Sequence, residues 1–144
     1  MRNIIDVPKM IIVSPFGPRV RDGKEEFHWG VDLRSWNLIS WRRLLVVAHE
    51  PMEVLRIWKD GWGTGFSVRP MTTAYDEFKY IHIEPTANVK KGALLNPGDH
   101  LGVSQAVPIK KWQEHIHFEV VKTGEKIDPV SLFQTCAMNF EVKK

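Results

Sequence analysis

The stretch Glu114-His115-Ile116-His117-Phe118-Glu119 decides the fold, because polar and apolar residues alternate along it with the two-residue period of a β-strand. On such a strand His115, His117 and Glu119 share one face, while the apolar residues between them pack on a core. The two imidazoles lie two strand rises apart, about 6.5–7 Å, which suits a pair that meets one metal ion or one reacting group. In the competing interpretation, both histidines simply lie on a strand face that is exposed to solvent.

The length of 144 residues favours one domain, spanning 1–144 and large enough to bury a core. The hydrophobic share of 43% and the charged share of 26% are typical of a globular protein. The nine prolines and ten glycines lie mostly between short apolar runs, which favours strands and turns over a helical bundle. We therefore expect a mainly β protein (β-rich α+β) with antiparallel sheets folded as one unit.

The net charge of +3 is too small to argue for a nucleic-acid partner, and it equally suits an anionic surface such as a bacterial wall. No apolar run approaches the roughly 20 residues of a membrane span, so we expect no integral membrane contact. The single cysteine, Cys136, excludes an intrachain disulfide and a Cys-rich zinc site. Any metal ion must therefore be held by histidines and carboxylates.

The second stretch of chemical interest is His28-Trp29-Gly30-Val31-Asp32. His28 and Asp32 are four residues apart, which places them on the same side of a strand or a helix, and Gly30 between them favours the strand. A hydrolytic zinc site usually has three protein ligands and one open position. His28, Asp32 and one histidine of the His-x-His pair meet that requirement, which leaves the other histidines for proton transfer.

Further segments are expected to surround these two stretches. Tyr80 to Glu84 alternates as a strand, with Tyr80, His82 and Glu84 on one face. The segment Arg34–Leu45 fits either a short helix or an inserted hairpin. The remaining histidines lie at turns, His49 before Glu50-Pro51 and His100 after Pro97-Gly98-Asp99, and are expected to be surface or structural residues.

Three of these motifs resemble elements of the lysostaphin/LytM-type zinc endopeptidases, which cut peptide links in bacterial peptidoglycan. His28-Trp29-Gly30-Val31-Asp32 resembles the H-x-G-x-D element of the family, Tyr80-Ile81-His82 its Y-x-H element, and His115-Ile116-His117-Phe118-Glu119 its H-L-H-F-E element. Further matches occur in the order of the family and include Phe16-Gly17-x-Arg19, Gly61-Trp62-Gly63 and Asp128-Pro129. The resemblance covers about residues 13–133, which we take as a peptidase core.

The resemblance implies antiparallel sheets that form a groove with long loops. It also implies one Zn²⁺ ion held by His28, Asp32 and His117, with His82 and His115 beside the water and the peptide bond to be cut. Which of these two histidines is the base stays open. Glu119 either orients His117 or is a plain structural acid. The implied substrate is a peptidoglycan stem or cross-bridge peptide.

Two alternatives compete with this interpretation. The first is a non-catalytic peptidoglycan-binding or activator module on the same fold. The second is a cupin-like or carbonic-anhydrase-like site in which both histidines of the His-x-His pair are ligands. Segments Val103–Glu114 and Arg34–Arg43 depart from the pattern of the family, so its bond specificity is not transferred to this chain.

The N-terminal segment has Asp6 and Pro8 where a signal peptide has its apolar centre. We therefore expect no Sec-type export signal in this chain. For a protein that acts on the wall, this favours a phage lysis enzyme or virion component that reaches a periplasmic or extracellular substrate by another route, and a removed leader is the alternative. We expect a monomer.

Overall fold

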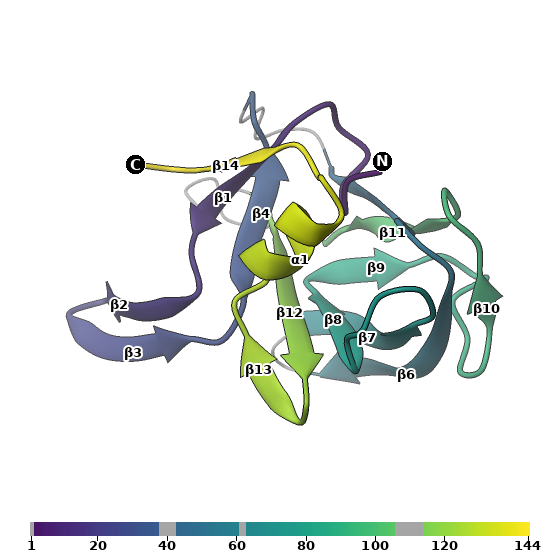
Figure 1. The fold of residues 1–144 in the computed structure, drawn as a ribbon. Coiled ribbons are helices and arrows are strands. Elements are labelled where there is room, and N and C mark those ends of the chain that lie inside the picture. Colours follow the sequence, from purple (N-terminus) through teal and green to yellow (C-terminus); the bar gives the residue numbers. More distant parts are fainter. Residues whose placement is uncertain (1, 38–42, 61–62, 106–113) are drawn as a thin grey trace.

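The computed structural model describes residues 2–37, 43–60, 63–105 and 114–144 (Figure 1). The described strands are β1 (Met10–Ser14), β2 (Gly17–Arg21), β3 (Lys24–His28), β4 (Val31–Ser35), β5 (Leu45–Val47), β6 (Met52–Asp60), β7 (Gly63–Pro70), β8 (Glu77–Ile81), β9 (Ile83–Pro85), β10 (Leu94–Leu95), β11 (His100–Ser104), β12 (Ile116–Lys122), β13 (Glu125–Ile127) and β14 (Phe140–Val142). The described helix is α1 (Val130–Thr135). The prediction of a mainly β fold is confirmed.

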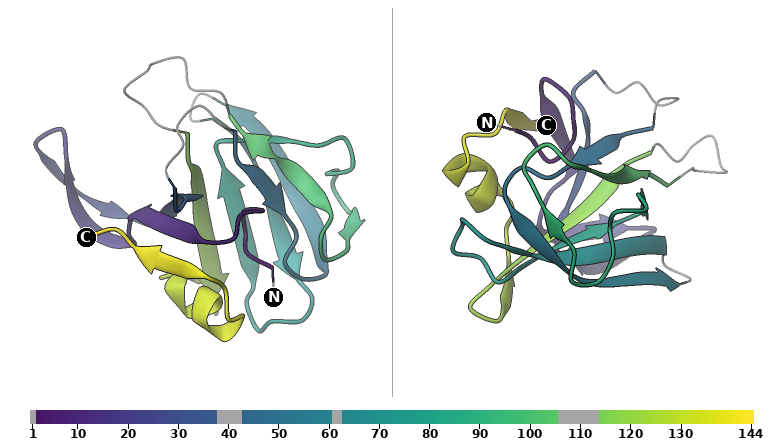
Figure 2. Two further views of the ribbon diagram at one scale, coloured as in Figure 1. Left: turned by 90° about the horizontal axis from the view of Figure 1, so that it is seen from above. Right: turned by 90° about the vertical axis from the view of Figure 1, so that its right-hand side faces the viewer.

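The described strands form three sheets. The main sheet has the order β10-β6-β7-β8-β12-β4-β1-β14, with β13 paired to β12. Its neighbouring described strands are antiparallel, apart from the parallel pair β1 and β14. A smaller sheet has the order β5-β11-β9, and β2 and β3 form a two-stranded ribbon that projects from the body of the molecule (Figures 1 and 2).

A row of aromatic rings fills the core on one face of the main sheet. Phe66, Tyr80 and Phe118 are successive ladder partners on β7, β8 and β12, and all three are fully buried. Their ring centroids are 4.8 Å apart for Phe66 and Tyr80 and 5.1 Å apart for Tyr80 and Phe118, and Phe133 of α1 stacks on Phe118 at 5.9 Å. Because side chains alternate along a strand, His117 points to the opposite face of the sheet.

The expected grouping of Tyr80, His82 and Glu84 on one strand face is wrong. His82 lies between β8 of the main sheet and β9 of the smaller sheet, and its φ of 67° is in the left-handed region. The chain changes sheets at this residue, so the strand alternation is interrupted. Tyr80 is consequently part of the core, and Ile81 lies on the face that carries His117.

The segment Arg34–Leu45 is described only at its ends, which belong to β4 and β5. Its middle, residues 38–42, lies outside the described residues, so the choice between a helix and a hairpin is not decided. Within the part of the chain that is described, no helix has the length and apolar character needed to cross a membrane.

A buried polar cluster joins the turn after β5 to the segment after β7. The His49 Nε2–H group donates to Glu50 Oε2 over 2.8 Å, and the backbone N–H groups of Thr72 and Thr73 donate to Glu50 Oε1 over 3.1 Å. Cys136 lies close enough to join His49 and Glu50 in a possible metal group. However, hydrogen bonds already satisfy both carboxylate oxygens, so we interpret the cluster as structural.

This cluster predicts an acid-sensitive contribution to stability. Burial by itself raises the pKa of Glu50, but hydrogen bonds from His49, Thr72 and Thr73 outweigh it and lower the pKa from 4.5 to about 2. A carboxyl whose pKa is lower in the folded state stabilises the protein above the unfolded pKa and loses that contribution as the pH falls. We expect a loss on the order of 3 kcal/mol between pH 4.5 and about 2.

Urea unfolding of the wild type and of Glu50→Gln across this pH range measures the effect. The variant should be less stable at pH 7 and should show a shallower decline on acidification. Glu25→Gln removes an exposed carboxylate on β3 and should follow the wild-type pH profile. Parallel profiles for the wild type and Glu50→Gln would contradict the assignment.

Candidate metal centre

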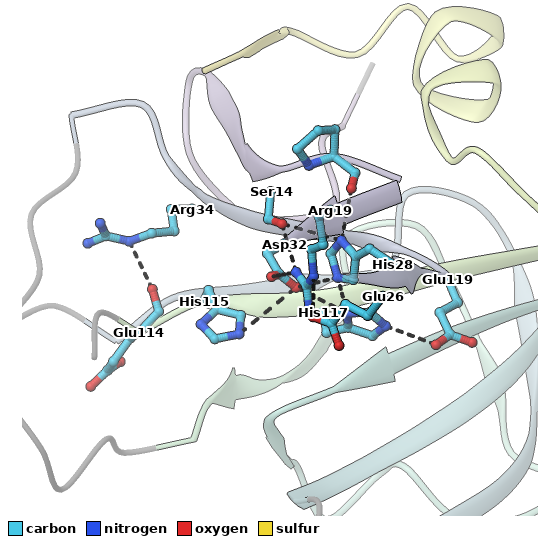
Figure 3. A network of polar contacts seen from close by, with 11 residues as sticks. Ser14, Arg19, Glu26, His28, Asp32, Arg34, Glu114, His115, His117 and Glu119 are labelled. Carbon is cyan, nitrogen blue, oxygen red and sulfur yellow. Dashed lines mark hydrogen bonds and ion pairs between the residues drawn. The ribbon is translucent and has the colours of Figure 1, made fainter. Parts of the chain in front are cut away.

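Three side chains from two parts of the chain converge on the face of the main sheet opposite the aromatic core (Figure 3). Asp32 of β4 and His117 of β12 are ladder partners, and His28 is the last residue of β3. His117 Nδ1 lies 3.0 Å from Asp32 Oδ1 and 3.1 Å from His28 Nε2, and His28 Nε2 lies 3.3 Å from Asp32 Oδ1. The sequence prediction placed these three residues together, and the structure brings them together.

The outward nitrogens of both histidines face acceptors. His28 Nδ1 lies 2.9 Å from the carbonyl oxygen of Pro15, and His117 Nε2 lies 2.9 Å from Glu119 Oε2. Because these acceptors hold the ring protons, the inward nitrogen of each neutral imidazole is a bare lone pair. When both imidazoles are neutral, two nitrogen lone pairs and one carboxylate oxygen meet, and either a metal ion or a proton must bridge them.

The separations of the three atoms fit zinc. Nitrogen and oxygen ligands about 2.0–2.1 Å from Zn²⁺ in a tetrahedron are about 3.3 Å from one another, and the observed separations are 3.0, 3.1 and 3.3 Å. Two imidazoles and one carboxylate are also a ligand set of hydrolytic zinc sites, which keep the fourth position open. The residues present thus fit the ion that the motifs imply.

The pKa values of His117 and Asp32 also indicate that the site favours a positive charge. Burial by itself lowers the pKa of His117, but hydrogen bonds to Asp32 and Glu119 outweigh it and raise the pKa to about 9. Burial likewise opposes ionisation of Asp32, yet hydrogen bonds from His117 and His28 hold the pKa of Asp32 well below its usual range. Without a metal ion, a proton on His117 therefore supplies the positive charge.

Gly30 explains why a glycine separates the two ligands of the first motif. A Cβ atom at this position would lie 2.4 Å from the carbonyl oxygen of Phe118 and 2.9 Å from His117 Nε2. It would also lie 2.9 Å from Glu119 Cγ. The backbone between β3 and β4 thus passes directly over the His117–Glu119 contact, and only a residue without a side chain allows this approach.

His115 and His82 lie beside the three candidate ligands. His115 Nε2 is 4.0 Å from Asp32 Oδ1. The ring centroid of His82 lies 5.1 Å from that of His115 and 6.5 Å from that of His117. Burial, together with the neighbouring His115 and His117, lowers the pKa of His82 to about 4, so this imidazole is neutral at pH 7. The backbone N–H of Gln105 donates to the His82 carbonyl over 2.7 Å and supports its left-handed conformation.

Sequence reasoning assigned no role to Arg19, although it noted this residue in the Phe16-Gly17-x-Arg19 motif. Arg19 Nη1 lies 3.6 Å from Asp32 Oδ2, the carboxylate oxygen that does not face the two histidines. Arg19 also donates to Glu26 Oε1 over 2.7 Å and to the Ser14 hydroxyl over 2.8 Å. Its guanidinium therefore joins the β2–β3 ribbon to the candidate ligand Asp32.

The position of Glu119 matches the alternative in which it orients His117. It is buried, accepts from His117 Nε2 and forms an ion pair with Lys126 of β13, whose Nζ lies 3.2 Å from Glu119 Oε1. The other two histidines stay outside the site, since His49 belongs to the buried cluster with Glu50 and His100 is exposed on β11.

Several solved structures share the fold of this chain. They include LytU (TM-score 0.66, 21% identity, covering 86% of this chain and 84% of that chain), lysostaphin (0.67, 18%, 90% and 51%) and a zinc-containing peptidase from Vibrio cholerae (0.61, 22%, 81% and 35%). No protein-family profile matches the sequence, and no curated protein sequence matches it significantly. At these identities the likeness establishes the lysostaphin/LytM-type fold that the motifs predicted.

We expect the protein to bind one zinc ion through His28, Asp32 and His117. Alanine at any of these positions removes one of three converging ligand atoms and should abolish stoichiometric zinc after dialysis, measured by inductively coupled plasma mass spectrometry. His100→Ala is the control for an exposed histidine. Loss of zinc in His115→Ala together with retention in His28→Ala would instead support a site in which both histidines of the His-x-His pair are ligands.

We expect Arg19→Met to weaken zinc binding about tenfold, because residues that hold a ligand in place typically contribute that much to metal affinity. Competition with a chromophoric chelator measures the change. Arg19→Lys retains the positive charge but cannot contact Glu26, Ser14 and Asp32 at once, so its zinc affinity should lie between those of the wild type and Arg19→Met. Lys24→Met, on the same ribbon, should bind zinc as the wild type does. Equal affinities for all four proteins would contradict the role of Arg19.

Proposed function

We propose that this chain is a zinc-dependent endopeptidase that hydrolyses peptide bonds in peptidoglycan stem or cross-bridge peptides. The observation that carries the proposal is the convergence of one nitrogen or oxygen atom each from His28, Asp32 and His117, with His82 and His115 beside them. Support comes from the shared fold with LytU, lysostaphin and a zinc-containing peptidase.

His28, Asp32 and His117 would hold the ion, which supplies a Lewis acid for the scissile carbonyl and makes water more acidic. The rest of the chemistry belongs to the side chains. Glu119 keeps the proton of His117 on its outward nitrogen, so that the inward nitrogen stays a ligand. Arg19 keeps the second oxygen of Asp32 turned away from the two histidines.

His82 and His115 are the candidates for proton transfer. Hydrolysis of a peptide bond needs one group that takes a proton from the attacking water and one that stabilises the oxyanion or protonates the departing amine. The two imidazoles lie next to each other, with ring centroids 5.1 Å apart, and His82 is neutral at pH 7 because of its low pKa. A neutral imidazole accepts a proton at one nitrogen and donates a hydrogen bond from the other.

The cellular route to the wall is a separate part of the proposal. Delivery by a phage and the monomeric state stay predictions. The full genomic reading frame and sedimentation of the purified protein test these two predictions.

We expect His82→Ala and His115→Ala to retain one zinc ion and to lose at least about 100-fold of the rate of wall cleavage, because general acid–base groups typically contribute that much. Mass spectrometry of fragments released from walls of contrasting cross-bridge chemistry measures the activity and identifies the bond. His100→Ala should cleave as the wild type does.

The same experiment separates a peptidase from a non-catalytic binding module. A wild-type protein that holds zinc and binds wall but releases no new amino termini from any wall type would contradict the proposal. Such a result would favour the binding or activator module.

A further inference from the structure

The row of ladder partners that contains the candidate ligands continues across the main sheet. From Asp32 and His117 the register leads to Ile81 of β8, Gly65 of β7 and Trp58 of β6. Ladder partners place their side chains on the same face of a sheet. The face that carries the candidate metal centre therefore extends to the indole of Trp58.

Gly65 makes room for this indole. A Cβ atom on Gly65 would lie 2.8 Å from Cζ2 and 2.9 Å from Cε2 of Trp58, so the ring occupies the space that a side chain would fill. Trp58 is half-buried, and the guanidinium carbon of Arg56 lies 5.4 Å from the centre of its ring. The indole is thus held between a glycine and a cation.

A neighbouring row on the same face carries two cations. From Glu119 the register leads to Lys79 of β8, Ser67 of β7 and Arg56 of β6. Glu119 is paired with Lys126, and neither Lys79 nor Arg56 has an acidic partner within the described part of the chain. We call Arg56, Trp58 and Lys79 the Arg56 patch.

Ser67 adds an unsatisfied donor beneath this patch. Its side chain is fully buried, and its hydroxyl has no hydrogen-bond partner among the described residues. The two cations on this surface therefore lack carboxylate partners among the described residues, with the unpaired Ser67 hydroxyl buried beneath them, whereas Arg19 and Lys126 near the metal centre are paired with Glu26 and Glu119. This excess of positive charge favours an anionic ligand.

We propose that the Arg56 patch is the subsite that binds a carboxylate-bearing residue of the substrate peptide. The inference rests on the proposed function and adds a charge preference to it. Strands are spaced about 4.7–4.9 Å apart, so β6 lies about 14 Å from β12. An extended peptide that crosses the strands rises about 3.3 Å per residue, so its anionic residue lies about four residues from the bond that is cut.

The guanidinium of Arg56 beside the indole of Trp58 suits a residue that carries a carboxylate. Arg56 offers paired N–H donors to a carboxylate, and Lys79 adds a second charge two strands away. Trp58 supplies an apolar surface for the aliphatic part of the same residue. Peptidoglycan stem peptides carry free carboxylates, so the patch and the proposed substrate are complementary in charge.

The test uses the zinc-loaded full chain and soluble muropeptides prepared from purified wall by a muramidase. The same mixture, after its carboxylates have been converted to amides, is the second probe. Calorimetry gives the dissociation constants, and cleavage gives kcat and KM separately. Lys59→Gln is the matched control, because it removes a charge from the same strand as Arg56 but on the opposite face, where Lys59 pairs with Thr64.

We expect Arg56→Gln and Lys79→Gln each to raise the dissociation constant and KM for the free-carboxylate peptides about three- to tenfold, with kcat unchanged. Lys59→Gln should leave both values within about twofold of the wild type. Amidation of the peptides should weaken binding to the wild type by a similar factor and have little further effect on the double variant Arg56→Gln/Lys79→Gln.

Equal binding of free and amidated peptides by the wild type would overturn the proposal, as would no binding of either form. An effect of Lys59→Gln as large as that of Arg56→Gln would also overturn it, because it would show a non-specific response to net charge. Failure of the proposed function is a different result, namely normal carboxylate-dependent binding without cleavage.

Discussion

The antiparallel pairing of β4 with β12 is the constraint on which the rest of the structure depends. Asp32 and His117 are 85 residues apart in the chain, and only the register of this pair places them opposite each other. A slip of one residue would turn either side chain toward Phe118 and the aromatic core. The apolar burial that fixes the register therefore also fixes the candidate metal centre.

The sequence predicted the local parts of this arrangement better than the long-range parts. Alternation around His115 and His117 correctly separated the face of the site from the core, because period-two patterning is a property of neighbouring residues. The same reasoning placed Tyr80 on the wrong face. A left-handed residue at His82 interrupts the alternation, and a change of sheet depends on distant contacts that a local pattern does not contain.

The roles of Arg19 and Trp58 were beyond sequence reasoning for a similar reason. The contact between Arg19 and Asp32 requires the β2–β3 ribbon to fold back on β4. The place of Trp58 on the face of the candidate metal centre requires the register of three further strand pairs. An arginine in a loop motif and a tryptophan in a strand each have many structural uses. Their signals become specific only when the register gives them neighbours.

The three candidate ligands differ in how firmly the fold holds them. Asp32 and His117 lie on central strands of the main sheet, whereas His28 ends a ribbon whose strands, among those described, pair only with each other. Contacts of Arg19 and the ring cluster of Phe16 and its neighbours attach this ribbon to the body. A metal ion bound to all three ligands would add a further link between ribbon and sheet. Metal binding and closure of the ribbon on the sheet would therefore be coupled, and the ion pair of Arg19 with Asp32 is a link between them that needs no metal.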